Sequence, residues 1–278
     1  MGNYEELKSL HVDCANGVAW VTINNGDINL LDLTMFMELT KTAGQLAADD
    51  DVRVVVLASA NPDFFIAHFD VTLIQQLPRH AGIPNEPNSF HAMCELFRTM
   101  PKPTIAMIEG RVGGGGSELA LSCDMRFAAI GKAIFNQPEV ALGILPGGSG
   151  TVRLSRLAGR SRAMEIILGC DDVDAVTAQL YGWVNRALPA ELIEPFVRRM
   201  ATRIAGFPVH AVRAAKAAIL RAEGDLTDHL IQESGAFNAT LGHENTPALL
   251  QQFLDIGGQT FVGERQLGQL AGELGQPR

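Results

Sequence analysis

Residues 108–124 have the sequence IEGRVGGGGSELALSCD, with four consecutive glycines at positions 113–116. An apolar stretch at 104–109 predicts a strand before the glycines, and a helix is predicted after them at 117–122. Glycine allows the backbone to take unusual shapes or to approach another group closely. Glu118 stands where a dinucleotide-binding loop would have its third glycine, and its carboxylate would repel a pyrophosphate. The stretch therefore predicts a tight strand-to-helix turn and disfavours a dinucleotide site.

Strands and helices are predicted to alternate on both sides of this turn up to about residue 190. Further strands are expected at 18–24, 53–59, 64–67, 124–129, 133–136 and 183–188, and further helices at 33–48, 70–77, 89–100, 151–170 and 176–181. In the helix at 33–48, we expect Leu33, Phe36, Met37, Ala43 and Ala47 on one side. From residue 190 onward only helices are predicted. The fold class is therefore α/β, with a helical C-terminal subdomain.

Composition excludes several classes of protein. The chain has 278 residues, of which 47% are hydrophobic, and its net charge is −9. It is long enough for a sizeable core and too apolar for a long disordered tail. An acidic balance disfavours nucleic-acid binding, which needs a basic surface. We see no signal peptide, no apolar run of about 20 residues and no CxxC pair among the four cysteines, so we expect a cytoplasmic protein with no membrane span and no metal.

Two glutamates stand in apolar surroundings beside predicted turns. Glu118 follows the glycine run, and Glu139 lies in the segment FNQPEVALGILPGGSG at 135–150. If both point into one partly dry pocket, their repulsion raises one or both pKa values, which suits general acid and base catalysis at neutral pH. The helix dipole alone also favours a glutamate at a helix start, so the pattern by itself leaves a structural role open.

The segments at 108–124 and 135–154 resemble those of the enoyl-CoA hydratase/isomerase (crotonase) superfamily. Weaker similarities are NLLD at 29–32 and AQLYGWVNRALP at 178–189. The resemblance implies a crotonase-like (ββα) spiral core at 1–195 that holds an acyl-CoA site. It also implies a helical region at 196–278 that serves in oligomerisation or as a lid. Because family members usually form trimers or dimers of trimers, we expect a homotrimer or a dimer of trimers.

The resemblance also implies an oxyanion hole. Family members bind acyl-coenzyme A thioesters, and two backbone N–H groups hold the thioester oxygen as the enolate forms. By motif position the two donors are the N–H groups of Gly115 and Phe69. The implied substrate-binding residues around them are Ala67, His68, Asp70 and Gly114.

Hydratases of the family have a glutamate at two positions, and this chain keeps both as Glu118 and Glu139. The resemblance implies that Glu118 positions and deprotonates the water that attacks Cβ, and that Glu139 supplies the proton at Cα. The implied reaction is the reversible hydration of a 2-enoyl-CoA to a 3-hydroxyacyl-CoA, with coenzyme A as part of the substrate and no other cofactor. Two alternatives remain open: isomerisation, hydrolysis or C–C cleavage of a CoA thioester, and non-catalytic binding of an acyl-CoA.

Two segments depart from the family pattern. The family usually has Ala-Gly-Ala-Asp where this chain has Ala-His-Phe-Asp at 67–70. The Phe69 ring is therefore expected to narrow or reshape the acyl pocket, and His68 either adds an acid–base group or packs at or under the loop surface. The segment LLQQFLDIGG at 249–258 lacks the basic run that helps to hold CoA phosphates in the family. Lys216 and Arg213 are the candidates to replace that run.

Overall fold

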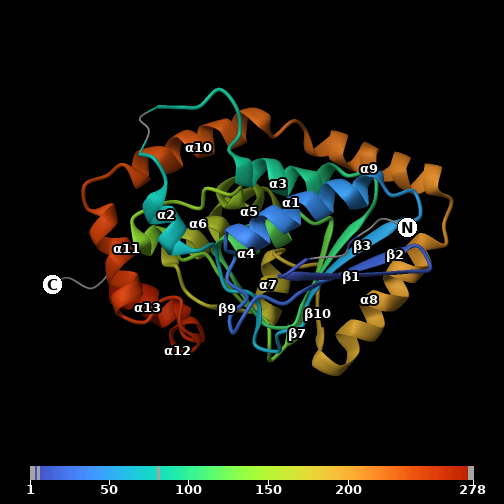
Figure 1. Cartoon of the computed structure of the whole chain (residues 1–278), viewed down its shortest axis with the longest axis horizontal. Coiled ribbons are helices and arrows are strands. Elements are labelled where there is room, and N and C mark those ends of the chain that lie inside the picture. The colour runs from blue at the N-terminus through green and yellow to red at the C-terminus, as the bar shows by residue number, and fades with distance from the viewer. Residues whose placement is uncertain (1–3, 5–6, 80–81, 275–278) are drawn as a thin grey trace.

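The computed structural model describes residues 4, 7–79 and 82–274, and its centre is a six-stranded sheet (Figure 1). The strand order is β1 (Leu10–Ala15), β2 (Val18–Ile23), β3 (Val54–Ser59), β5 (Thr104–Ile108), β7 (Met125–Ile130) and β10 (Arg186–Pro189). Strand β1 is antiparallel to β2, and every other neighbouring pair is parallel. A second sheet has the order β4 (Phe64–Ile66), β6 (Arg111–Gly113), β8 (Ile134–Asn136) and β9 (Val173–Asp174).

Helices cover both faces of the six-stranded sheet, which explains the continuous apolar run of β3. Val54 and Val56 belong to a core cluster with residues of α8 (Ala190–Ala205). Val55 and Leu57 belong to a second cluster with residues of α1 (Leu33–Ala48) and α3 (Ser89–Thr99). The predicted α/β class is confirmed.

Helix α1 has the predicted bounds, but the predicted buried face is partly wrong. Asp32 caps the helix by accepting a hydrogen bond from the Met35 N–H. The buried positions are Met35, Leu39, Thr42, Ala43 and Leu46. Leu33 and Met37 are instead more than half exposed. The predicted grouping skipped Leu39, which lies one turn from Met35 and from Ala43 and so marks the inner face.

Two other helices differ from their predicted bounds. Helix α4 (Gly114–Leu121) begins inside the glycine run and not after it. The helix predicted at 151–170 is two helices, α5 (Gly150–Ala158) and α6 (Arg160–Gly169), separated by Gly159 with a φ of +80°. The remaining helices before the C-terminal region are α2 (Val71–Gln76), the 3₁₀ turn η1 (Glu139–Leu142) and α7 (Ala175–Tyr181).

The C-terminal helices form an arch around the core (Figure 1). They are α9 (Val209–Glu223), α10 (Thr227–Leu241), α11 (Thr246–Asp255), α12 (Phe261–Glu264) and α13 (Leu267–Leu274). The predicted boundary at residue 195 falls inside α8, which packs against the sheet, so the core extends to the end of that helix. None of the described helices is both long enough and apolar enough to cross a membrane.

Candidate active site

The glycine run allows α4 to pack directly against β4. A Cβ at Gly116 would lie 2.6 Å from the Cβ of Ile66, so no larger residue fits there without movement. Gly114 has a φ of +43°, in the left-handed region that favours glycine. Together these residues bring the N-terminus of α4 against the segment that follows β4, and they direct Glu118 into the interior.

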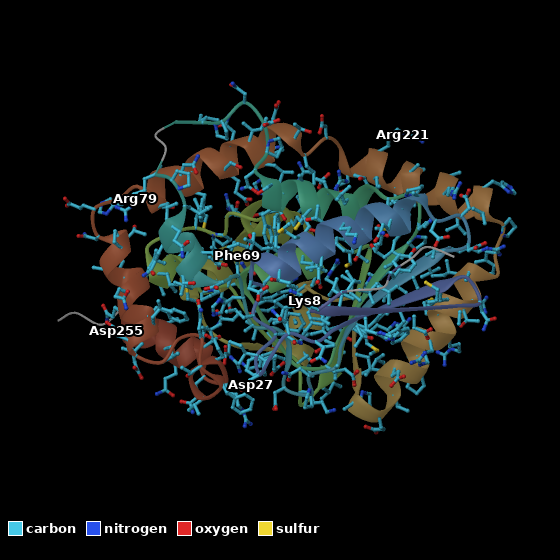
Figure 2. The ribbon with its side chains drawn as sticks, in the orientation of Figure 1. Lys8, Asp27, Phe69, Arg79, Arg221 and Asp255 are labelled. Atoms are coloured by element: carbon cyan, nitrogen blue, oxygen red, sulfur yellow. The ribbon has the colours of Figure 1, made fainter. Side chains whose placement is uncertain are left out.

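A cavity of about 470 Å³ lies at this junction. Its polar lining includes Glu118, Glu139 and His68, and Phe69 and Gly115 also border it. Its other aromatic walls come from four helices: Phe36 of α1, Phe90 of α3, Phe237 of α10 and Phe253 of α11. Phe69 lies near the middle of the view in Figure 2, whereas Arg79 and Asp255 lie at the outer edge. With this lining, the cavity has a small polar centre and a largely apolar wall.

Glu118 is buried and is held by the loop that precedes α5. Its Oε1 accepts hydrogen bonds from the N–H groups of Gly148 and Gly150, both at 2.8 Å. Burial raises the pKa of Glu118 well above its usual range, and the nearby carboxylates of Glu139 and Glu233 raise it further. The two N–H donors oppose this shift because they stabilise the ionised form.

Glu139 is the first residue of η1 and is also buried. Gln137 donates a hydrogen bond from its Nε2 to Oε2 of Glu139 at 3.2 Å. Burial raises the pKa of Glu139 to about 7. Both glutamates line one cavity and both have raised pKa values, which suits proton exchange with a bound molecule.

Two backbone N–H groups beside the cavity, those of Phe69 and Gly115, have no backbone acceptor in the turns and loops of the described residues. Leu31 forms a parallel β-bridge with Phe69. The Leu31 N–H donates to the His68 carbonyl oxygen at 2.9 Å, and the Leu31 carbonyl oxygen accepts from the Asp70 N–H at 3.1 Å. In a parallel bridge of this kind, the N–H of the residue between them, Phe69, points away from Leu31. Gly115 is in the first turn of α4, where N–H groups have no intrahelical acceptor. A Cβ on Gly115 would lie 3.1 Å from the Phe69 Cβ, so the two segments adjoin.

The other predicted substrate-binding residues differ in their positions. His68 lines the cavity, is buried and pairs with Glu264. Gly114 lies between His68 and Glu139. Ala67 is buried and borders a different, very small cavity. Asp70 caps α2 by accepting a hydrogen bond from the Thr72 N–H at 2.8 Å, which is a structural role.

Another buried carboxylate near the site, Glu233 of α10, was not predicted from the sequence. It accepts hydrogen bonds from the N–H groups of Ser149 (2.7 Å) and Thr151 (3.0 Å) and from Nε2 of His91 (2.7 Å). Four successive N–H groups, from 148 to 151, therefore donate alternately to Glu118 and Glu233. Nothing in the local sequence around Glu233 marks it, because its partners lie more than 80 residues away.

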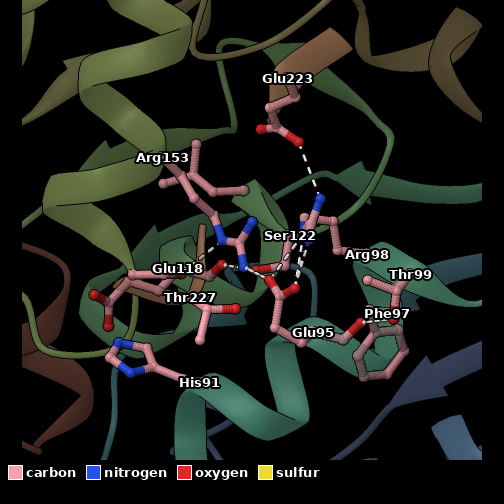
Figure 3. Close-up of polar contacts among 12 residues, drawn as sticks. His91, Glu95, Phe97, Arg98, Thr99, Glu118, Ser122, Arg153, Glu223 and Thr227 are labelled. Atoms are coloured by element: carbon pink, nitrogen blue, oxygen red, sulfur yellow. Dashed lines mark hydrogen bonds and ion pairs between the residues drawn. The ribbon is translucent and has the colours of Figure 1, made fainter. Parts of the chain in front are cut away.

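A polar network adjoins this loop and connects α3, α5 and α9 (Figure 3). Arg153 is buried and contacts Glu95, and Glu95 also pairs with Arg98, which reaches Glu223. Arg153 further donates to the Ser149 hydroxyl at 2.7 Å. Arg153 therefore belongs to the interior, unlike a basic residue on a solvated helix face.

The proposed replacement for the missing CoA-binding basic run is also wrong for Lys216. Its side chain is buried and donates to Asp124 at 2.7 Å and to the Lys102 carbonyl at 2.9 Å. Because the Lys216 ammonium group already binds these two partners, it supports the fold and is not available to a phosphate. Arg213 is partly exposed, and its nearest carboxylate oxygen, on Asp50, is 3.7 Å away.

Known proteins with this fold and site can now be compared. A model of the family described as "Enoyl-CoA hydratase/isomerase" matches residues 13–264. The chain therefore belongs to the enoyl-CoA hydratase/isomerase family of enzymes, as its sequence predicted.

Individual relatives agree with this assignment. The short-chain-enoyl-CoA hydratase of Clostridium acetobutylicum is 34% identical over 257 residues, which cover 90% of this chain and 96% of that protein. The crotonyl-CoA hydratase of Syntrophomonas wolfei is 31% identical over 242 residues, covering 85% and 91%. A solved structure from Streptomyces avermitilis, provisionally named an enoyl-CoA hydratase, superposes with a TM-score of 0.89 at 38% identity and covers 97% of this chain and 99% of its own.

Proposed function

We propose that this enzyme catalyses the reversible hydration of a 2-enoyl-CoA to a 3-hydroxyacyl-CoA. The observation that carries the proposal is the pair of buried carboxylates, Glu118 and Glu139, in one cavity with the N–H groups of Phe69 and Gly115. The relatives named as enoyl-CoA and crotonyl-CoA hydratases support it. A lone carboxylate would suit isomerisation, whereas adding water across a double bond needs one proton removed and another delivered.

In the proposed mechanism the thioester oxygen accepts hydrogen bonds from the N–H groups of Phe69 and Gly115. These donors and the N-terminal dipole of α4 stabilise negative charge on that oxygen as the enolate forms. Glu118 removes a proton from the water that attacks Cβ. Glu139 delivers a proton to Cα and also holds the water. The reverse reaction uses the same groups with their roles exchanged.

We propose that the reaction requires no metal and no redox cofactor. Its steps are proton transfers and stabilisation of an enolate, which carboxylates and backbone N–H groups can perform. Coenzyme A enters only as part of the substrate. We also propose a cytoplasmic location, which is consistent with the four free cysteines.

The direct test is incubation of the protein with crotonyl-CoA and with longer and aromatic 2-enoyl-CoAs. We expect the absorbance of the conjugated thioester to fall, and mass spectrometry to show the gain of one water. An unchanged mass with a moved double bond would establish isomerisation, and a fragment would establish hydrolysis or C–C cleavage. Tight binding of CoA thioesters without turnover of any of them would establish a non-catalytic acyl-CoA-binding protein.

Replacing Gly115 with alanine tests the oxyanion hole. The added methyl would lie 3.1 Å from the Phe69 Cβ and 3.2 Å from the Phe90 ring, so it would push apart the segments that carry the two N–H donors. Because small misplacements of reacting groups are costly, we expect kcat to fall by up to about a hundredfold. The matched control is Gly44→Ala in α1, where a Cβ meets nothing within 4 Å. Equal kcat values for both variants would contradict the assignment of Gly115.

The proposed homotrimer or dimer of trimers has its own test. Exposed apolar side chains occur on three neighbouring parts of the chain, α5, α6 and α7: Leu157, Met164, Leu168, Val176 and Leu180. A second copy covering such side chains would remove apolar surface from water. Light scattering on the purified protein is expected to give the mass of three or six chains. A monomer at micromolar concentration would contradict the expectation.

A further inference from the structure

His68 occupies the position at which the family usually has glycine, and it is buried. Its Nδ1 lies 2.7 Å from the Phe69 carbonyl oxygen, and its Nε2 lies 2.9 Å from Oε1 of Glu264. A carbonyl oxygen can only accept a hydrogen bond, and so can an ionised carboxylate. With Glu264 ionised, both ring nitrogens of His68 must carry hydrogen, and the ring is then an imidazolium paired with that carboxylate.

Glu264 belongs to a C-terminal turn that contacts the segment around Phe69 at several points. Its Oε1 also accepts a hydrogen bond from the Gln259 N–H at 2.7 Å. The Gln259 side chain accepts from the Val71 N–H at 2.6 Å and donates to Asp70 at 3.0 Å. The turn at 259–264 therefore fixes residues 68–71, the segment that presents the Phe69 N–H to the cavity.

Gly114 lies close to both His68 and Glu139. A Cβ at Gly114 would lie 2.7 Å from Oε1 of Glu139 and 3.1 Å from the Cβ of His68. The phenyl ring of Phe253 packs edge-on against the imidazole, with 5.7 Å between ring centroids, which shields that side of the ring from water. Because both side chains are buried, a charge on His68 acts on Glu139 with less screening than in water.

The other titratable groups near the two residues come from α4, α10 and β6, from Asp172, and from Cys170, which interacts electrostatically with Glu139. Glu118 of α4 and Glu233 of α10 add negative charge near Glu139. Arg111 of β6 acts on Glu264 from the far side, and it is itself paired with Asp172 at 2.6 Å. Among the described residues whose charge acts on Glu139, His68 is the group that stabilises its carboxylate.

We propose that His68 is a positioning residue for the reaction: Glu264 keeps it charged, and its charge controls the protonation of Glu139 while its ring holds the Phe69 carbonyl group. The part that concerns catalysis rests on the proposed hydration. Electrostatics agree with the geometry. Burial alone lowers the pKa of His68, but the Glu264 carboxylate raises it to about 9. Burial opposes ionisation of Glu264 as well, yet the charge of His68 holds the pKa of that carboxyl below its usual value.

The charge of His68 can be measured without any substrate. In full-length protein labelled with ¹⁵N-histidine, with His68→Gln used for assignment, we expect the His68 ring to stay doubly protonated at pH 7.5. In Glu264→Gln it should lose a proton well below that pH. The matched control is Glu191→Gln, an exposed carboxylate of α8, which should leave the His68 titration unchanged. A neutral His68 ring at pH 7.5, or an unchanged titration in Glu264→Gln, would overturn the proposal.

The effect on Glu139 needs a second measurement. With ¹³C-carboxyl glutamate, assigned through Glu139→Gln, we expect the titration of Glu139 to move to higher pH by about one unit in both His68→Gln and Glu264→Gln, because an opposite charge has been removed. An unmoved Glu139 titration would overturn the proposal. Both labelling experiments remain decisive if the protein hydrates no enoyl-CoA, which would contradict only the proposed function.

Kinetics separate the charge from simple support of the loop. With a substrate that the enzyme hydrates, His68→Gln and Glu264→Gln should each move the alkaline limb of the pH profile of kcat to higher pH by about one unit. Gln259→Ala removes two contacts with residues 70 and 71 and keeps the charged pair, so it should lower kcat and leave the limb in place. If all three variants lower kcat with one unchanged pH profile, His68 serves only to support the loop, and the proposal fails.

Discussion

Replacing Glu118 with glutamine is expected to lower kcat for hydration by roughly a thousandfold, within the range of general acid–base catalysis. Glutamine keeps a side-chain oxygen that can accept hydrogen bonds from the N–H groups of Gly148 and Gly150, so the loop should keep its position. What the variant loses is the ability to take a proton from water. KM should change far less than kcat, because the oxyanion donors and the apolar wall remain.

The experiment needs a control for the removal of a carboxylate as such. Glu191→Gln makes the same chemical change on an exposed part of α8, which packs against the opposite face of the sheet, and it should leave kcat unchanged. Thermal unfolding of both variants should resemble that of the wild type. The role assigned to Glu118 is wrong if Glu118→Gln and the wild type turn over equally on every accepted substrate.

Replacing Glu139 with glutamine is expected to lower kcat by a similar factor, about a hundredfold to ten-thousandfold, and to change the pH profile as well. A carboxyl group that donates a proton must be protonated. Because burial raises the pKa of Glu139 to about 7, wild-type hydration should decline as the pH rises through neutrality. Glutamine cannot titrate, so this alkaline limb should disappear from the residual activity.

The rate of the reverse reaction, dehydration, should depend on pH in the opposite direction, which gives a sharper check. Dehydration needs the ionised form of Glu139, so its rate should increase as the pH rises through about 7. In heavy water, the wild-type hydration product should carry deuterium at Cα. An alkaline limb of hydration that persists unchanged in Glu139→Gln would mean that a group other than Glu139 donates the proton.

Much of this site was predictable because it is local in the sequence. The glycine run, Glu118 and Glu139 lie within two short segments, and close packing of α4 on β4 explains why glycine is needed at Gly116. The strand-rich segments were also identified, since β3 and β5 are continuous apolar runs that suit a sheet covered on both faces. Such features depend on neighbours in the chain, and a single sequence displays them directly.

The rest of the site was not predictable because it depends on distant partners. Glu233 and Glu264 look like ordinary helical glutamates, and only the arch of C-terminal helices brings them to residues 149–151 and to His68. Lys216 was misjudged for the same reason, since Asp124 lies 92 residues before it. The departure from the family pattern at His68 was visible, but its meaning required the position of Glu264.

The alternation of N–H groups between Glu118 and Glu233 has a consequence for substrate choice. The N–H groups of Gly148 and Gly150 donate to Glu118, whereas those of Ser149 and Thr151 donate to Glu233. A proton that arrives on Glu118 weakens its two hydrogen bonds and loosens the loop whose intervening N–H groups restrain Glu233 on α10. That helix also supplies Phe237 and Leu241 to the cavity wall. The wall around the acyl chain is thereby sensitive to each proton transfer, so the preferred chain length should itself vary with pH.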